Sequence, residues 1–374
     1  MRAKPVAALV LAFVFAPASL PAENWPFFRG PSRQGTSAEK GLPRTWSSTD
    51  NIAWKTATPG FGWSSPVIWG KRVFLTAATE DGASCHILSL DADGGKILWD
   101  REVLQQPVRR KEKKNSYATP TPATDGRRVY AVFADGSIVA VDYSGRVLWT
   151  NRDHSFYSQH GLGASPVLHR NLLIMAYDGS SDGEDKKIGW QKPWDRSYVV
   201  ALDTATGKER WRARRGLSRI AHVTPNIATV DGKQQLVSAA GDVIQGFDLS
   251  DGKLLWTVRS QGEGVVPSVV IGDGLAFTSS GFEKTTMRAV RLSGAVGDAT
   301  ASHIAWEQTK GVSHIPSFLF VRPWLFSVTE GGIAMAQQAS TGRMVWQQRL
   351  GGEYSSSPVH GDGAIYFVSE TCET

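Results

Sequence analysis

The sequence has few of the features that would support a disulfide-rich, helical or membrane-spanning protein. Only two cysteines, Cys85 and Cys372, occur in 374 residues. They lie too far apart in sequence to indicate a disulfide framework, and their pairing is left open. No long apolar stripe repeats every 3.6 residues, which excludes a helical repeat protein. After the first 22 residues, no apolar run is long enough to cross a bilayer.

The common catalytic motifs are also missing. There is no His-Glu-x-x-His zinc motif, no Gly-x-Ser-x-Gly nucleophile elbow and no Gly-Lys-Ser/Thr phosphate loop. The acidic residues Asp178, Asp182, Glu184 and Asp185 fit no established calcium loop, so a solvated insertion is favoured over a calcium site. The sequence therefore predicts no catalytic or metal-binding residue, and it favours a protein that is not an enzyme.

Residues 1–22 have the order of a secretory signal peptide. Arg2 and Lys4 form a basic start, residues 6–16 form an apolar run, and cleavage is expected after Ala18 or Ala22. Prolines on both sides of the run argue against the alternative, a buried N-terminal helix. No cysteine follows the cleavage region, so no lipid anchor is expected there. We expect an exported protein, periplasmic or extracellular.

Charge gives only a weak indication of the partner. Without Arg2 and Lys4, 39 basic residues face 35 acidic ones. The densest basic stretch, residues 109–114, suits an anionic partner such as lipid headgroups or an acidic polysaccharide, although a solvated loop is the simpler interpretation. Nucleic acid is not expected outside the cell.

Glycine and tryptophan are abundant, with 38 and 14 residues, which is typical of a turn-rich all-β protein. Six units can be aligned, each running from a residue followed by proline to a tryptophan. They are Ser65-Pro66 to Trp99, Thr119-Pro120 to Trp149, Ser165-Pro166 to Trp211, Thr224-Pro225 to Trp256, Val266-Pro267 to Trp306 and Ile315-Pro316 to Trp346. Counted from Trp54, the tryptophans are 45, 50, 62, 45, 50 and 40 residues apart. This period is typical of the blades of a β-propeller.

The strands inside each unit support the same fold. Segments such as residues 128–133 are apolar on both alternating faces, as expected where every blade packs between two others. Hairpin turns are predicted at Asp125-Gly126, Asp231-Gly232 and Asp273-Gly274. We therefore predict an all-β propeller of four-stranded antiparallel blades. A two-sheet sandwich is the alternative, but sandwiches do not repeat a tryptophan at this period.

Each unit ends in an Asp-x-x-x-Gly-x-x-x-Trp motif, as in Asp203-Gly207-Trp211. Aspartate accepts backbone N–H groups in the turn, glycine takes a positive φ, and tryptophan is expected to dock between neighbouring blades. The unit of Asp142 is one residue shorter, the sixth has Gln338 for aspartate, and an insertion at residues 294–301 distorts the fifth. The predicted docking residues are Trp54, Trp99, Trp149, Trp211, Trp256, Trp306, Trp346, Gly95, Gly145, Gly207, Gly252 and Gly342.

This motif resembles the tryptophan-docking repeat of the pyrroloquinoline-quinone-like (PQQ-like) propeller superfamily. Residues 24–31, 51–55 and 62–67 resemble a secreted branch of that superfamily. Such relatives usually close as eight blades, whereas six units and a partial one at residues 357–368 are visible here, with Trp54 unpartnered. We therefore expect residues 23–374 to form one propeller domain that is truncated at its C-terminus relative to its relatives.

The resemblance implies two functions of different classes. One is a periplasmic interaction scaffold, similar in architecture to the propeller lipoprotein of the outer-membrane barrel-assembly machinery. The other is a PQQ-dependent alcohol or sugar dehydrogenase, in which the quinone lies near the axis with Ca²⁺, a catalytic carboxylate and often a disulfide of adjacent cysteines. This chain has no adjacent cysteines and no ligand set that maps residue by residue, so no cofactor is expected and the scaffold is favoured. A carbohydrate-binding propeller is a lesser alternative.

The long loops at residues 105–117, 153–161 and 178–195 are the expected binding surface for a protein or polysaccharide, on one face of the propeller. Trp190 and Trp194 lack a docking motif, so they are either exposed stacking platforms or packed under their own loop. His154, His160, His222 and His314 fall near the starts of units, and buried or rim-exposed roles are favoured over metal ligation. The candidate partner-binding residues are Arg109, Arg110, Lys113, Lys114, Tyr157, His160, Trp190 and Trp194.

Overall fold

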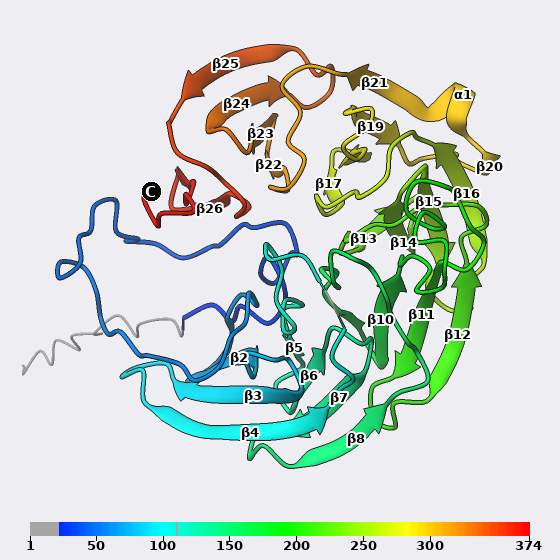
Figure 1. The fold of residues 1–374 in the computed structure, drawn as a ribbon. Coiled ribbons are helices and arrows are strands. Elements are labelled where there is room, and N and C mark those ends of the chain that lie inside the picture. Colours follow the sequence, from blue (N-terminus) through cyan, green and yellow to red (C-terminus); the bar gives the residue numbers. More distant parts are fainter. Residues whose placement is uncertain (1–21, 110) are drawn as a thin grey trace, which may run out of the picture.

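The described chain is a ring of β-sheets around a central axis (Figure 1). The computed structural model describes residues 22–109 and 111–374, so the predicted signal peptide lies outside the described residues except for Ala22. The only helix in the described part is the short α1 (Thr300–His303), and no described helix is long and apolar enough to cross a membrane. The predicted all-β propeller is confirmed.

Six of the described sheets are blades of four antiparallel strands; the fourth blade carries an additional strand, and the chain order of the fifth skips that strand. The first three contain β1 (Val67–Trp69), β2 (Arg72–Ala78), β3 (Ser84–Asp91) and β4 (Ile97–Gln105); β5 (Ala123–Thr124), β6 (Arg128–Val132), β7 (Ile138–Asp142) and β8 (Val147–Asn151); and β9 (Val167–His169), β10 (Leu172–Tyr177), β11 (Tyr198–Asp203) and β12 (Glu209–Arg214). The next three contain β13 (Asn226–Val230), β14 (Lys233–Ala240), β15 (Val243–Asp248) and β16 (Leu254–Arg259); β17 (Val270–Gly272), β18 (Leu275–Ser279), β19 (Met287–Arg291) and β21 (Ile304–Gln308); and β22 (Leu319–Val321), β23 (Trp324–Val328), β24 (Ile333–Gln338) and β25 (Met344–Arg349).

Two departures from this pattern occur in the described chain. The strand β20 (Gly297–Asp298) lies in the predicted insertion and joins the fourth sheet, parallel to β16. A two-stranded sheet of β26 (Val359–Gly361) and β27 (Ala364–Tyr366) follows the sixth blade. The N-terminal region holds this hairpin, because the N–H of Ser37 donates to the carbonyl of His360 at 2.8 Å and that of His360 donates to the carbonyl of Gly35 at 2.8 Å.

The strands are buried on both faces, as the apolar pattern predicts. The residues of β7 and β10 are almost all buried, because each blade packs between two neighbours. The turns at Asp231-Gly232 and Asp273-Gly274 connect β13 to β14 and β17 to β18 with positive φ at both residues, 48° and 77° in the first and 49° and 76° in the second. This backbone favours Asp-Gly and matches the twist of the strands that it joins.

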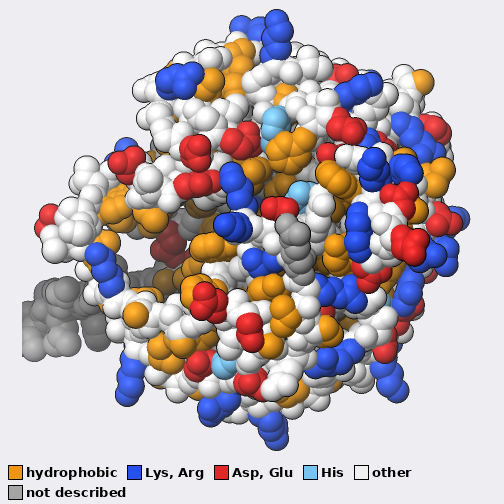
Figure 2. All heavy atoms as spheres, in the orientation of Figure 1, with side chains coloured by type: hydrophobic (Ala, Val, Ile, Leu, Met, Phe, Trp, Pro, Cys, Tyr) orange, Lys and Arg blue, Asp and Glu red, His pale blue; other side chains and the backbone are white. Residues whose placement is uncertain are grey.

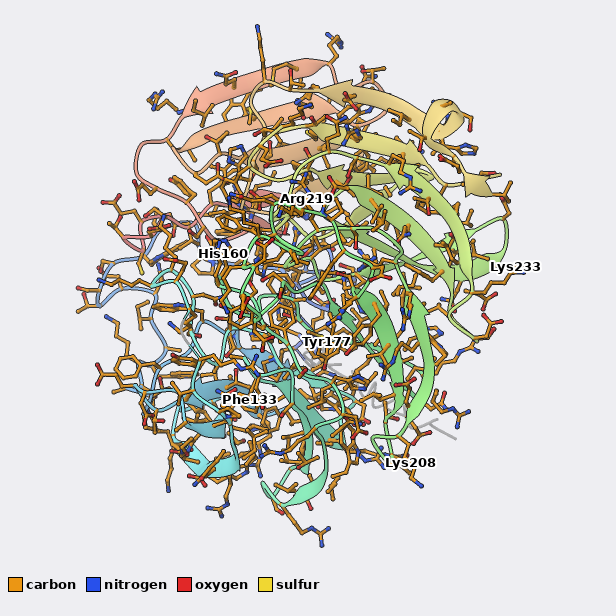
Figure 3. All side chains as sticks on the ribbon, turned by 45° about the vertical axis from the view of Figure 1, so that its right-hand side comes forward. Phe133, His160, Tyr177, Lys208, Arg219 and Lys233 are labelled. Carbon is orange, nitrogen blue, oxygen red and sulfur yellow. The ribbon has the colours of Figure 1, made fainter. Side chains whose placement is uncertain are left out.

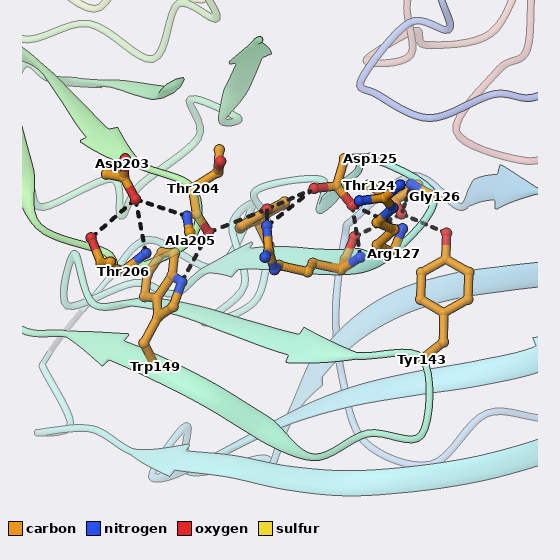
Figure 4. Close-up of polar contacts among 12 residues, drawn as sticks. Thr124, Asp125, Gly126, Arg127, Tyr143, Trp149, Asp203, Thr204, Ala205 and Thr206 are labelled. Carbon is orange, nitrogen blue, oxygen red and sulfur yellow. Dashed lines mark hydrogen bonds and ion pairs between the residues drawn. The ribbon is translucent and has the colours of Figure 1, made fainter. Parts of the chain in front are cut away.

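The docking motif joins one blade to the next through hydrogen bonds and close packing. In Figure 4, the indole N–H of Trp149 donates to the carbonyl of Thr204 in the following blade at 3.0 Å. The carboxylate of Asp203 accepts the backbone N–H groups of Ala205 and Thr206, both at 3.0 Å. Gly207 has a φ of 70°, and a Cβ there would lie 2.5 Å from the Trp149 ring. The glycine is therefore required both by the turn and by the docked ring.

The same contact recurs around most of the ring. The indole N–H donates to a carbonyl at 2.8–3.0 Å in the pairs Trp54–Ala92, Trp99–Tyr143, Trp149–Thr204, Trp211–Leu249 and Trp306–Ala339. The glycines that meet these rings are Gly95, Gly145, Gly207, Gly252 and Gly342. Trp54, unpartnered in the sequence alignment, thus docks on the first blade.

Two of the seven predicted docking tryptophans do not make this contact with a carbonyl of the next blade. Trp256 donates to the side chain of Gln235 in its own blade at 2.6 Å, and it is 1% exposed. The inserted strand β20 runs beside it, with Gly297 paired to Trp256, so the insertion replaces the usual docking turn. Trp346 is 41% exposed, and no hydrogen bond of its indole occurs in the described chain. In the described chain, the neighbouring sheet of β26 and β27 has no docking turn that packs against the Trp346 ring.

A second chain of contacts connects the blades near the axis. The backbone N–H of Ser65 donates to the hydroxyl of Thr121 at 2.9 Å, that of Thr121 to Ser165 at 3.0 Å, and that of Ser165 to Thr224 at 2.9 Å. The pattern continues from Ser268 to Ser317 and from Ser317 to Ser357, both at 2.9 Å. The unit boundary at Thr119-Pro120 is therefore corrected to Thr121-Pro122, since Thr121 occupies the position equivalent to Ser165.

Ser165→Ala is expected to destabilise the ring by about 1–3 kcal/mol, because the buried N–H of Thr121 would lose its acceptor. Urea denaturation measures the change. Ser48→Ala is the control: Ser48 is exposed, and a change within about 0.5 kcal/mol is expected. Equal effects of the two substitutions would contradict a structural role for the axial hydroxyls.

Candidate functional site

One end of the central channel is closed by the chain itself. Residues 24–37 contact strands or strand-flanking residues of six sheets. The N–H and carbonyl of Trp25 pair with Ile68 at 2.8 Å, and the Arg29 guanidinium donates to the carbonyl of Phe318 at 2.7 Å. The other partners of this segment are Thr124, Leu168, Ile271 and His360. We call residues 24–37 the axial plug.

Arg29 anchors this plug. Its side chain is buried and also donates to the carbonyl of Gln34 at 3.0 Å, and burial lowers its pKa to about 9. Gly30 follows with a φ of 77°, and a Cβ there would lie 2.5 Å from the Trp25 ring. The geometry of this turn thus depends on a residue without a side chain. The resemblance drew attention to residues 24–31 without indicating that they fill the channel.

The axial end of the ring contains a funnel of about 510 Å³. Phe28 of the axial plug lines it, so the funnel and the plug meet. Around it lie residues of the axial contacts between blades: Thr121, Ser165, Thr224 and Ser317, whose hydroxyls accept a backbone N–H, and Ser268, whose N–H donates to Ser317. Figure 2 shows hydrophobic side chains and histidine near the centre of one face of the ring. A volume of this size is typical of sites for small ligands.

Aromatic side chains surround the funnel. Trp63 is 64% exposed and Phe282 is 51% exposed, although both are large apolar residues. Trp190 is half-buried and lies near His160, with ring centroids 6.3 Å apart. Exposed aromatic rings that converge on one cavity are typical of binding surfaces rather than of a closed core.

Two histidines form part of the funnel wall. The ring centroids of His160 and His222 lie 6.2 Å apart, with the rings at 89°. His222 is 9% exposed, and neither of its ring nitrogens has a hydrogen-bond partner among the described residues. Burial, with a smaller contribution from His160, lowers the pKa of His222 to about 3, and burial also lowers the pKa of His160. At neutral pH both rings are therefore uncharged.

The titratable residues at the funnel include two acids and one base. Glu112, Glu263 and Lys114 line it. Burial, together with the nearby Glu283, raises the pKa of Glu263, and Arg219 opposes this shift. Arg219 itself pairs with Asp242 at 2.7 Å and with Glu283 at 2.8 Å. Figure 3 shows His160 and Arg219 toward the middle of the ring, whereas Lys208 and Lys233 project from its outside.

The basic residues that the sequence suggested for partner binding have different surroundings in the structure. Lys114 lines the funnel and Lys113 is exposed. Arg109 pairs with Asp182 at 2.9 Å, and its guanidinium lies 5.7 Å from the centre of the Tyr157 ring. Arg110 lies outside the described residues. Arg109 and Tyr157 thus connect two of the long loops beside the funnel.

The two candidate tryptophans have different surroundings. Trp190 lines the funnel together with His160. Trp194 packs against Gly189, and its indole N–H donates to Ser197 at 3.0 Å. Trp194 therefore lies under its own loop, which was one of the two alternatives from the sequence.

His154, His314 and three of the four acids considered as a calcium site have structural partners. His154 packs against Tyr177, with ring centroids 5.3 Å apart, and His314 is within hydrogen-bond distance of Thr285 at 2.9 Å. Asp178 is buried in an ion pair with Arg215 at 2.5 Å. Asp182 and Asp185 pair with Arg109 and Lys192 at 2.9 and 2.8 Å. In the described part of the chain, no cluster of three His, Cys, Asp or Glu side chains has the arrangement of a metal site.

Sequence reasoning expected binding at the loops of one face and at the axial funnel, but it did not identify most of the residues that line the funnel. It identified Lys114, His160 and Trp190, but not Trp63, Phe282, Glu263 or the role of His222. A signal was present, because a serine or threonine adjoins the proline at the start of nearly every unit. Placed in a ring, these positions define the axis, and the loops next to them supply the funnel wall.

The comparisons with solved structures support the fold. The structure of BamB from Moraxella catarrhalis matches with a TM-score of 0.57 at 16% identity, covering 82% of this chain and 78% of that chain. Quinohemoprotein alcohol dehydrogenase ADHIIG from Pseudomonas putida HK5 matches with a TM-score of 0.48 at 12% identity, covering 91% of this chain and 75% of that chain.

The sequence comparisons give a relative and a family. Methanol dehydrogenase [cytochrome c] subunit 1 of Paracoccus denitrificans is 26% identical over 156 residues, which is 40% of this chain and only 22% of that protein. The family described as outer membrane protein assembly factor BamB matches residues 44–181, 194–296 and 293–372. These matches cover most of the chain. The chain therefore belongs to the family described as outer membrane protein assembly factor BamB, within the PQQ-like propeller superfamily.

Proposed function

We propose that this chain is an exported binding scaffold that captures a protein or polysaccharide at the funnel face of its propeller. The observation that carries the proposal is the combination of a channel closed by the axial plug with an open funnel of about 510 Å³. Trp63 and Phe282 line that funnel, and they are 64% and 51% exposed. A rigid ring of blades holds these side chains in place, which reduces the entropy lost on binding.

The PQQ-dependent dehydrogenase is the second candidate, and the charges at the funnel do not suit its cofactor. Pyrroloquinoline quinone is a tricarboxylate, which needs several cationic groups around it. Among the described lining residues, Lys114 is a single cation beside Glu112 and Glu263. His160 and His222 are neutral at pH 7 because burial lowers their pKa values. These residues favour a ligand without net negative charge.

Site-specific photo-crosslinking tests the proposed scaffold. A benzophenone amino acid is placed at Trp63 or Phe282, and at the exposed outer-strand residues Leu148 and Leu254 as controls. In envelope extract of the source organism, adducts are expected at the two funnel positions and not at the two controls. Digestion by protease or by glycosidases then identifies the class of the partner. Adducts equally frequent at all four positions, or at none, would contradict the proposal.

A titration with pyrroloquinoline quinone and Ca²⁺ tests the second candidate. Cofactor fluorescence and thermal stability of the mature protein are followed together. We expect neither a saturable change in fluorescence nor a rise in melting temperature. A saturable change with a clear gain in stability would overturn the scaffold proposal and justify assays with alcohols and sugars.

A further inference from the structure

The unsatisfied side chain of His222 is the first indication of a specific ligand. It is buried in the funnel wall, and its Nδ1 and Nε2 have no hydrogen-bond partner among the described residues. Buried polar groups are normally hydrogen-bonded. A Cβ at Gly163 would lie 3.0 Å from the Cβ of His222, so the glycine leaves room for this ring. The ring thus carries one donor and one acceptor, buried at the funnel wall, that no described residue uses.

The axial hydroxyls add further donors. Thr121, Ser165, Thr224 and Ser317 each accept a backbone N–H from the preceding blade. A hydroxyl that accepts one hydrogen bond still has its own proton to donate. In the part of the chain that the structure describes, none of these four protons is used. All four residues line the funnel.

Aromatic faces complete the lining. Trp63 and Phe282 are exposed, Trp190 is half-buried, and Phe28 of the axial plug lies at the inner part. The C–H groups on the face of a sugar ring are weakly positive and pack well on the negative face of an aromatic ring. Aromatic faces together with hydroxyl and imidazole groups match a molecule that is apolar on its faces and hydroxyl-rich at its edge.

Charge and shape limit the ligand further. Lys114 is the single described cation at the funnel, beside Glu112 and Glu263, which disfavours a polyanion. Residues 24–37 bond to sheets around the ring and contribute Phe28 to the funnel, so the axial plug lies in the path of a polymer through the ring, and the end of a chain fits the funnel better than its middle. A cavity of about 510 Å³ lies within the range of sites for small ligands, about 300–1,000 Å³.

We propose that the funnel binds the terminal residues of an uncharged glycan, with Trp63 and Trp190 against the sugar faces and His222 and the axial hydroxyls at the sugar hydroxyls. This inference rests on the proposed function, because it assumes that the funnel is the binding site of the scaffold. It names the chemistry of the ligand, which the comparisons leave open. A peptide segment is the competing occupant, and the experiment separates the two.

The test is binding of the mature protein to an array of neutral glycans, followed by titration of maltotriose, cellotriose and chitotriose. Tryptophan fluorescence and saturation-transfer NMR report binding. Saturable binding of at least one neutral oligosaccharide is expected. Trp63→Ala should weaken it about tenfold, as for the loss of one aromatic contact. His222→Phe and His222→Asn should each weaken it without a large change in melting temperature.

Trp346→Ala is the matched control, because Trp346 is a partly exposed tryptophan on the outer strand β25 and does not line the funnel. It should leave glycan binding unchanged. No saturable binding to any neutral glycan, or binding that Trp63→Ala and both His222 variants leave unchanged, would overturn the inference. Crosslinked adducts at Trp63 that only protease removes would also overturn it, while the proposed scaffold function would stand.

Discussion

Trp211→Ala is expected to lower the free energy of unfolding by about 3–5 kcal/mol, the range for removing a large buried aromatic side chain. Trp211 is 7% exposed, lies over Gly252 of the next blade and donates to the carbonyl of Leu249 at 3.0 Å. Its removal leaves a cavity between two blades and an unpaired carbonyl. The midpoint of urea unfolding, followed by tryptophan fluorescence and circular dichroism, measures the loss.

Trp346→Ala provides the comparison, because it removes the tryptophan at the same motif position of another unit. Trp346 occupies the equivalent position in its unit, but it is 41% exposed and has no docking turn against it in the described chain. We expect a loss of less than about 1 kcal/mol, since an exposed side chain contributes little burial. Similar losses for Trp211→Ala and Trp346→Ala would show that the sequence motif, rather than its docking, determines the effect.

The second large effect concerns pH. Burial lowers the pKa of His222 to about 3, whereas a histidine in the unfolded chain titrates near pH 6.5. Between these values the unfolded state binds the proton and the folded state does not. The stability associated with the neutral ring is therefore complete above about pH 6.5 and is lost as the pH falls toward 3. The loss amounts to about 1.4 kcal/mol per pH unit, up to about 5 kcal/mol.

Urea unfolding of the wild type and of His222→Phe between about pH 7 and pH 4 measures this effect. Carboxylates titrate in both proteins, so the difference between them isolates the histidine. The wild type should lose more stability on acidification than the variant. His160 faces His222, and burial lowers its pKa too, so a parallel series with His160→Phe separates the two rings. A difference between the wild type and His222→Phe that does not vary with pH would contradict the prediction.

The repeat in the sequence determined the fold because its signals are local. Asp203, Gly207 and Trp211 lie within nine residues, and the hydrogen bonds of Asp203 form inside that turn. A local motif that recurs at a blade-length period predicts both the strands and the ring. The same locality explains where the prediction was incomplete, since the insertion at residues 294–301 changes the contacts of Trp256 through a strand pairing that the motif does not describe.

The sequence by itself determined that this chain is a ring of tryptophan-docked blades, and only the tertiary structure decided where that ring has a site. Trp63, His222 and Phe282 come from different blades and have no common spacing, so no local pattern connects them. Their convergence depends on the circular arrangement of the blades, which brings the start of each unit to the axis. The axial plug could not be predicted from the sequence either, because the hydrogen bond from Arg29 to Phe318 joins residues that are 289 positions apart. Long-range packing of this kind follows from the folded ring and not from the order of residues in any one unit.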